Sequence, residues 1–156
     1  MAIQIAPADV NLSVNMPLPA AANNNTTPVL DLQAIAPNSC AWQLGRIKVT
    51  VPALPENNTG AGITFAIQAA PVSLTSQVKA PALPPPGVFV TPNPSQTITI
   101  AAVANGGSLA GVYYFTIPSD ANGSSYQFIQ FLQTVPAGVV TQGEVISYAF
   151  VSEMGN

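Results

Sequence analysis

The side chains that could take part in acid–base chemistry are few and far apart in this sequence. It has nine charged residues among 156, and it has no histidine. The six carboxylates are dispersed along the chain: Asp9, Asp31, Glu56, Asp120, Glu144 and Glu153. A glycosidase needs two carboxylates flanking the scissile bond, and a serine or cysteine nucleophile needs a neighbouring base, usually histidine. We therefore expect no catalytic residues and a protein that is not an enzyme.

Two short segments resemble binding motifs without completing them. Residues 120–124, Asp-Ala-Asn-Gly-Ser, match the start of a calcium loop. The positions that need a glycine and a bidentate glutamate are occupied by Ser125 and Phe131. Residues 60–62, Gly-Ala-Gly, lack the third glycine and the following helix of a dinucleotide loop. We interpret the first segment as an Asx turn between strands, and we expect no metal and no cofactor.

The scarcity of positive charge and of long apolar runs excludes two classes of partner. Arg46, Lys48 and Lys79 are the three basic residues, too few to neutralise the phosphates on which nucleic-acid affinity depends. No apolar run reaches the length of about 18 residues that a membrane-spanning helix needs. The amino terminus lacks the positive segment of a secretory signal. We expect no nucleic-acid partner, no membrane, and assembly in a cytoplasm.

The overall composition favours a subunit of an assembly. Hydrophobic residues make up 48% of the chain, charged residues 6%, and the formal net charge is −3. A surface with so little charge does little to keep copies apart in solution. Sixteen prolines also disfavour long helices.

Alternation of apolar and polar residues predicts β-strands throughout the chain. In residues 46–51 and 63–68 every second residue is apolar and is predicted to face the core. Residues 112–117 are predicted to form a well-buried strand. The other predicted strands are residues 29–33, 88–91, 97–102, 126–133 and 145–151. About eight short strands with Gly-, Pro- and Asn-rich turns predict an all-β, jelly-roll-like β-sandwich.

Two segments are predicted to lie outside this core. Residues 1–27 carry scattered apolar side chains, and those of residues 12–18 have a period of two, so we expect an extended N-terminal arm that adds to a neighbouring subunit's sheet edge. Deleting residues 1–20 should then leave the sandwich domain, residues 28–156, folded. Residues 80–94 predict a Pro-rich loop with polyproline character. A floppy terminus and an ordinary surface loop are the alternatives. The candidate interface residues are Leu12, Val14, Met16, Leu18, Pro84, Pro85 and Val88.

Several segments resemble small capsid decoration (cement) proteins of tailed bacteriophages. Residues 16–32, MPLPAAANNNTTPVLDL, are similar to that family's Leu-Pro-Ala-Ala segment leading into an Asp-Leu strand. Residues 46–68, RIKVTVPALPENNTGAGITFAIQ, resemble its Val-Pro-Ala-Leu-Pro corner and Thr-Phe strand, and residues 114–131 its later hairpin. The chain departs from the family at Ser125, often an arginine, and at residues 69–72, often an acidic, Gly-containing turn. The resemblance implies a jelly-roll or similar β-sandwich that trimerises on the outer capsid lattice and braces the shell.

The sequence therefore predicts a non-enzymatic structural virion protein. We expect a capsid decoration protein that binds the major capsid protein as a homotrimer on the outer capsid surface, after assembly in the host cytoplasm. One alternative is a major coat or fibre subunit of a virus, which would assemble without another protein. The other is a lectin-like or receptor-binding module, for which Trp42, Glu56 and Asp120 are the candidate loop-tip residues.

Overall fold

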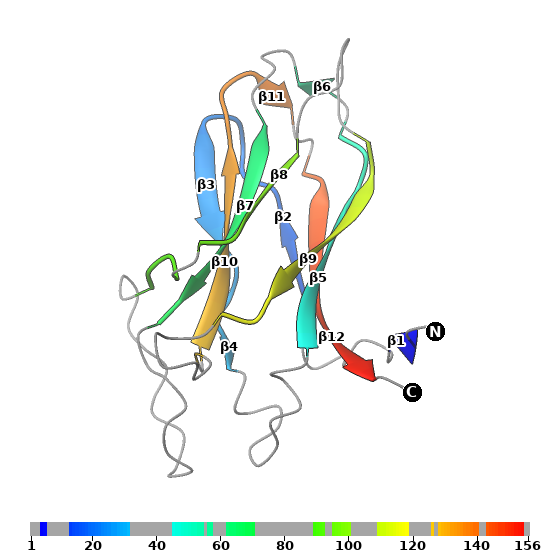
Figure 1. Ribbon diagram of the computed structural model, residues 1–156. Coiled ribbons are helices and arrows are strands. Elements are labelled where there is room, and N and C mark those ends of the chain that lie inside the picture. Colours follow the sequence, from blue (N-terminus) through cyan, green and yellow to red (C-terminus); the bar gives the residue numbers. More distant parts are fainter. Residues whose placement is uncertain are drawn as a thin grey trace.

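The protein consists of β-strands arranged in two facing sheets (Figure 1). The computed structural model describes residues 4–5, 13–31, 45–54, 56–57, 62–70, 89–92, 95–100, 109–118, 126, 128–140 and 143–154. Within these residues the regular secondary structure is all β, in two five-stranded sheets and one separate two-stranded pair. The all-β prediction is confirmed, and the two sheets form a β-sandwich.

The first sheet is built around its longest strand, β12 (Val145–Met154). Its other members are β1 (Gln4–Ile5), β2 (Ser13–Pro17), β5 (Gly45–Val51) and β9 (Gly111–Thr116). β12 pairs with β5 along one side and with β1 and β2 along the other, and β5 also pairs with β9. The sheet therefore has one edge formed by β1 and β2, and a second edge formed by β9.

The second sheet is centred on β10 (Phe128–Val135) and β7 (Ile63–Ala69). Its edges are formed by β8 (Thr97–Ile100) on one side and by β3 (Asn23–Thr26) with β4 (Leu30–Asp31) on the other. Thr27 joins β3 and β4 to β10, because its N–H donates to the Phe131 carbonyl and its hydroxyl accepts from the Phe131 N–H. The separate pair consists of β6 (Glu56–Asn57) and β11 (Val139–Val140).

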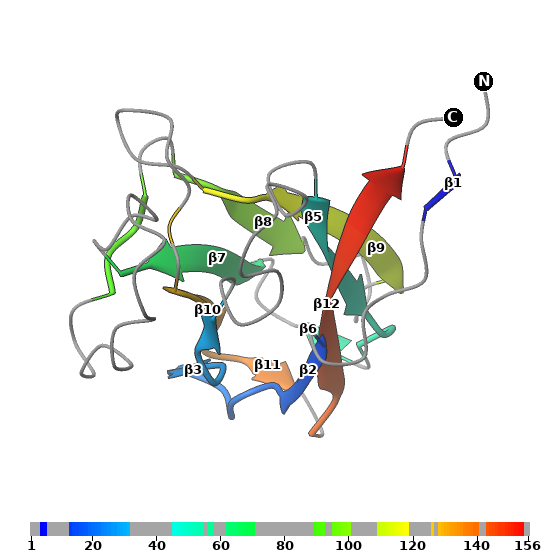
Figure 2. The same ribbon diagram turned by 90° about the horizontal axis from the view of Figure 1, so that it is seen from below.

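The antiparallel pairing of the main strands is nested along the chain. β2 pairs with β12, β3 with β10, β5 with β9, and β7 with β8. Each pair encloses the next one in sequence, and successive pairs belong to alternate sheets. The view in Figure 2 shows the two sheets as separate layers. Chain segments that are distant in sequence are therefore held together across the whole sandwich.

The alternation predicted for two strands is confirmed by the burial of their side chains. β7 alternates strictly between buried and half-buried residues, and the predicted inward positions of β5 are also buried. These core side chains are Ile47, Val49 and Val51 in β5, and Ile63, Phe65 and Ile67 in β7. Burying one such aliphatic or aromatic side chain stabilises a fold by roughly 1.5–3 kcal/mol.

The prediction of a well-buried strand at residues 112–117 is wrong for the outward-facing side chains. Val112 is 48% exposed and Tyr114 is 42% exposed, whereas Phe115 is buried. β9 forms an edge of the first sheet, and its outer side meets solvent. An apolar run on both faces of a strand predicts cover on both faces, but it does not show where the strand lies in the sheet.

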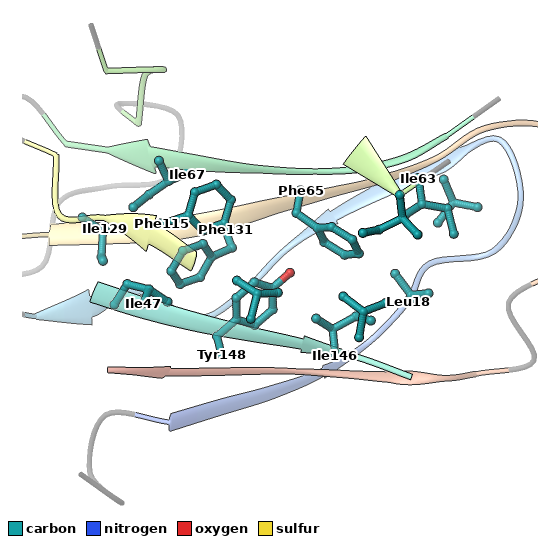
Figure 3. Close-up of a cluster of buried hydrophobic side chains, with 14 of the residues drawn as sticks. Leu18, Ile47, Ile63, Phe65, Ile67, Phe115, Ile129, Phe131, Ile146 and Tyr148 are labelled. Atoms are coloured by element: carbon teal, nitrogen blue, oxygen red, sulfur yellow. The ribbon is translucent and has the colours of Figure 1, made fainter. Parts of the chain in front are cut away.

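A stack of aromatic rings joins the two sheets at the centre of the core (Figure 3). The Phe131 ring of the second sheet lies 4.4 Å from the Tyr148 ring and 5.7 Å from the Phe115 ring of the first, centroid to centroid. Phe65 meets the edge of Tyr148 at 6.5 Å. Aromatic pairs of this kind contribute about 0.5–1.5 kcal/mol beyond the area that they bury.

The predicted boundary between an arm and a sandwich at residue 27 is not confirmed. β2 and β3 are strands of the two sheets, and Leu18 between them belongs to the core cluster. The Leu18 N–H donates to the Glu144 carbonyl at 2.8 Å. The alternating residues of this segment form β2, which pairs with β12 of the same chain. Residues 80–88 of the Pro-rich loop lie outside the described residues, and Val90 forms a bridge with Ala69.

Candidate interaction surface

Gln133 places a polar amide inside the sandwich, between the two sheets. Its Nε2 donates to the Tyr148 hydroxyl at 3.0 Å. Its Oε1 and the Oδ1 of its cross-strand neighbour Asn25 are both buried and accept no hydrogen bond from the described residues. Burial raises the pKa of Tyr148 more than the Gln133 hydrogen bond lowers it. The hydroxyl therefore stays neutral, and the pair acts as a hydrogen-bonded link between β10 and β12.

Replacing Tyr148 with phenylalanine is expected to lower the free energy of unfolding by about 1–3 kcal/mol. The ring stack is kept, but the buried Gln133 amide loses its one hydrogen-bond partner. Removing both polar groups, in Tyr148→Phe with Gln133→Leu, should recover most of the loss, because the amide that lost its partner is then also absent. Urea denaturation of the three proteins measures this. Equal midpoints for Tyr148→Phe and wild type would contradict it.

The outer side of the first sheet combines positive charge with exposed apolar side chains. Lys48 of β5 lies directly opposite Tyr114 of β9, and Thr50 lies opposite Val112. Val145, at 49% exposure, also points outward from this sheet. Exposed apolar side chains on one side of a sheet make that side a candidate interaction surface.

The outer side of the second sheet is different, because most of its described positions carry uncharged polar side chains. One row across the strands consists of Asn24, Thr134, Thr64 and Thr99. Gln130 lies opposite Gln68 on the same side of the sheet, and its Nε2 donates to the Gln68 Oε1 at 2.8 Å. Among the described side chains of the named strands, the exposed large apolar ones are Val112, Tyr114 and Val145, all on the first sheet, whereas Val90 lies beside β7 outside the named strands. The outer side of the first sheet is therefore the candidate surface.

Gln96, which precedes β8, links the second sheet to Thr116 at the end of β9 in the first sheet. Its backbone carbonyl accepts from Ile67 of the second sheet at 3.4 Å. Its side-chain Oε1 accepts from the Thr116 N–H at 2.8 Å, and its Nε2 donates to the Thr116 carbonyl at 3.1 Å. The amide therefore pairs with Thr116 as another strand would. This contact holds the end of β9 and lies on the side away from β5.

The predicted interface residues are divided between the fold and the undescribed part of the chain. Val14 packs against the core, Met16 is half-buried in β2, and Leu18 is buried. The remaining four, Leu12, Pro84, Pro85 and Val88, lie outside the described residues, as do Trp42 and Asp120 of the lectin-like alternative. Glu56 lies in β6, paired with Val140. The apolar, uncharged segment GVYYFT of β9 is the sequence signal that indicates the surface, although its apolar character by itself predicts a buried strand.

Comparison with known proteins leaves the fold and this surface as the basis for assigning a function. No protein-family model matches the chain, and no curated protein matches it significantly. No helix within the described residues is long and apolar enough to cross a membrane. Those residues also contain no group of three or more His, Cys, Asp or Glu side chains that could hold a metal ion.

Proposed function

We propose that this chain is a non-enzymatic capsid decoration protein that binds the outer lattice of a phage capsid as a homotrimer and stabilises the shell. The observation that carries the proposal is the outer side of the first sheet, where Val112, Tyr114 and Val145 are each exposed. Apolar contact with few charges suits a subunit that must stay bound to a large protein surface. The resemblance of residues 16–32 and 46–68 to decoration proteins supports the same function.

The strand pairing also supports a jelly roll, the fold that the resemblance implies. Eight strands wound as two Greek keys form such a sandwich. Here the first main strand pairs with the last and each following pair lies inside the previous one, in alternate sheets. This order is expected when one long antiparallel hairpin is rolled into two layers. A jelly roll presents both sheets to the outside, so that one can contact the shell and the other solvent.

The test measures mass and binding with the full chain. Light scattering after size exclusion should give about three times the chain mass of 16.0 kDa. The protein should also co-sediment with undecorated capsids of the phage that encodes it. Val145→Lys on the outer side of the first sheet should weaken co-sedimentation, whereas Thr99→Lys on the second sheet should not. A concentration-independent monomer that does not bind capsids would refute the proposal. Assembly into shells or filaments without capsids would favour the coat or fibre alternative.

A further inference from the structure

We infer that the free edge of β9 pairs with β9 of a second copy of this chain, so that the first sheet continues from one copy into the next. β9 has six residues, GVYYFT, with no proline and no charged side chain. Sheet edges are usually protected by charge, by proline or by being short. The opposite edge ends in Pro17 of β2, and β8 at the edge of the second sheet has four residues. β9 is the least protected of these edges.

The backbone groups available on β9 follow from the contact with Gln96. In a strand, the N–H and C=O of one residue point to the same side, and successive residues alternate between the two sides. Thr116 directs both groups to Gln96, away from β5. Tyr114 and Val112 therefore direct theirs to the same open edge, and no hydrogen bond to them comes from that side within the described residues. The two N–H and two C=O groups of these residues are therefore available to pair with another strand.

The same two residues make the edge complementary to itself. Antiparallel pairing centred on Tyr113 places Val112 opposite the second copy's Tyr114, and Tyr114 opposite the second copy's Val112. Each of these pairs exchanges two hydrogen bonds. Their side chains meet on the outer side of the sheet, as an aromatic and a β-branched residue, which is a favourable cross-strand pair. The Gln96 contact at Thr116 ends the pairing there.

The charges around this edge permit the pairing. Lys48 lies in the row of Tyr114, one strand away from the edge. In the paired sheet that row continues through the second copy's Val112 and the second copy's Thr50, so the two lysines lie in different rows. Like charges directly opposite each other would destabilise a sheet, and this register avoids them. A second copy thus fits the edge in hydrogen bonding, side-chain shape and charge.

Antiparallel pairing of identical strands has a two-fold axis and closes after two copies. It is therefore a different contact from the three-fold contact of the proposed trimer. In a trimer it would join one subunit to a subunit of a neighbouring trimer, and in a free chain it would form a dimer. The inference stands whether or not the proposed virion function is correct.

Disulfide trapping tests the register directly. In a Cys40→Ser background, which removes the chain's one native cysteine, Val112→Cys and Tyr114→Cys are prepared as separate variants. When they are mixed, the new cysteine of one variant faces the new cysteine of the other at a Cα distance of about 5.5 Å, within the range for a disulfide. Either variant alone brings its cysteines only to a diagonal separation of about 7–8 Å. The mixture should form linked pairs on a non-reducing gel, and each variant alone should not.

Two outcomes overturn the inference: a mixture that stays unlinked under mild oxidation, or single variants that link as readily as the mixture. Circular dichroism checks that the variants keep the wild-type fold. Val112→Lys with Tyr114→Lys provides a second measurement, because it places four positive charges at the proposed contact. Its mass by light scattering should be half that of the wild type at concentrations where the wild type pairs. Equal masses would also overturn the inference. Thr97→Lys with Thr99→Lys on the β8 edge is the matched control.

Discussion

Replacing Phe131 with alanine is expected to lower the free energy of unfolding by about 3–5 kcal/mol. Phe131 is fully buried, and its ring lies between Phe115 and Tyr148 of the facing sheet. The substitution removes both ring contacts and leaves a cavity where the two sheets meet. Typical domains are stable by about 5–15 kcal/mol, so a loss of this size would leave much of the protein unfolded in mild denaturant.

Leu132→Ala is the matched control, because Leu132 is the next residue of the same strand and points to the outer side of the second sheet. Leu132 is only half-buried, so its loss opens no cavity between the sheets. Urea denaturation followed by circular dichroism should give a markedly smaller shift of the midpoint for Leu132→Ala than for Phe131→Ala. Equal shifts would show that the aromatic stack is not the centre of the core.

The sequence was sufficient to predict the strands whose two faces differ. In β7 the residues on one face are aliphatic or aromatic and those on the other are small or polar, so the period of two defines both the strand and its inward face. The same is true of β5, where Arg46 and Lys48 alternate with buried residues. Hydrophobic burial directly determines these positions, and no knowledge of neighbouring strands is needed.

The position of a strand within its sheet could not be predicted in this way. β9 is apolar on both faces, which is typical of a strand covered on both sides, but β9 is an edge strand with Val112 and Tyr114 exposed. Gln133 is the opposite case. It is a polar residue, but its side chain is fully buried and donates a hydrogen bond to Tyr148. The exposure of β9 and the burial of Gln133 both depend on strands that are distant in sequence. The candidate surface on β9 was therefore missed, and it became visible only when the strand order was known.

Residues 13–18 show how a correct local pattern led to a different placement. The alternation of Val14, Met16 and Leu18 predicted a strand that would add to a sheet edge, and β2 does lie at an edge. The sequence does not show whether that edge belongs to the same chain or to a neighbouring subunit. β12 of the same chain pairs with all five residues of β2. Pairing within one chain requires no association of two molecules, so it is favoured wherever the connection can reach.

Deletion of residues 1–20 is therefore expected to destabilise the domain by more than about 3 kcal/mol, in contrast to the expectation from the sequence. The truncation removes Leu18, and loss of one buried leucine side chain costs about 2–5 kcal/mol. It also removes the pairing of β2 with Val145–Ala149 and leaves that side of β12 without hydrogen-bond partners. An uncovered strand of this kind promotes aggregation, so the truncated protein should also be less soluble.

Deletion of residues 1–12 is the matched control, because it keeps β2 and Leu18, and the one described pairing that it removes is the short one of β1 with Glu153 and Met154. The shorter truncation should melt close to the full-length protein, and the longer one well below it. Thermal melting by circular dichroism compares the three chains. If the longer truncation melts like the full-length protein but no longer co-sediments with capsids, then residues 13–18 act as an arm and their packing against β12 does not stabilise the domain. If it melts early, the burial of Leu18 and the cover that β2 gives to β12 make this segment the first strand of the sandwich.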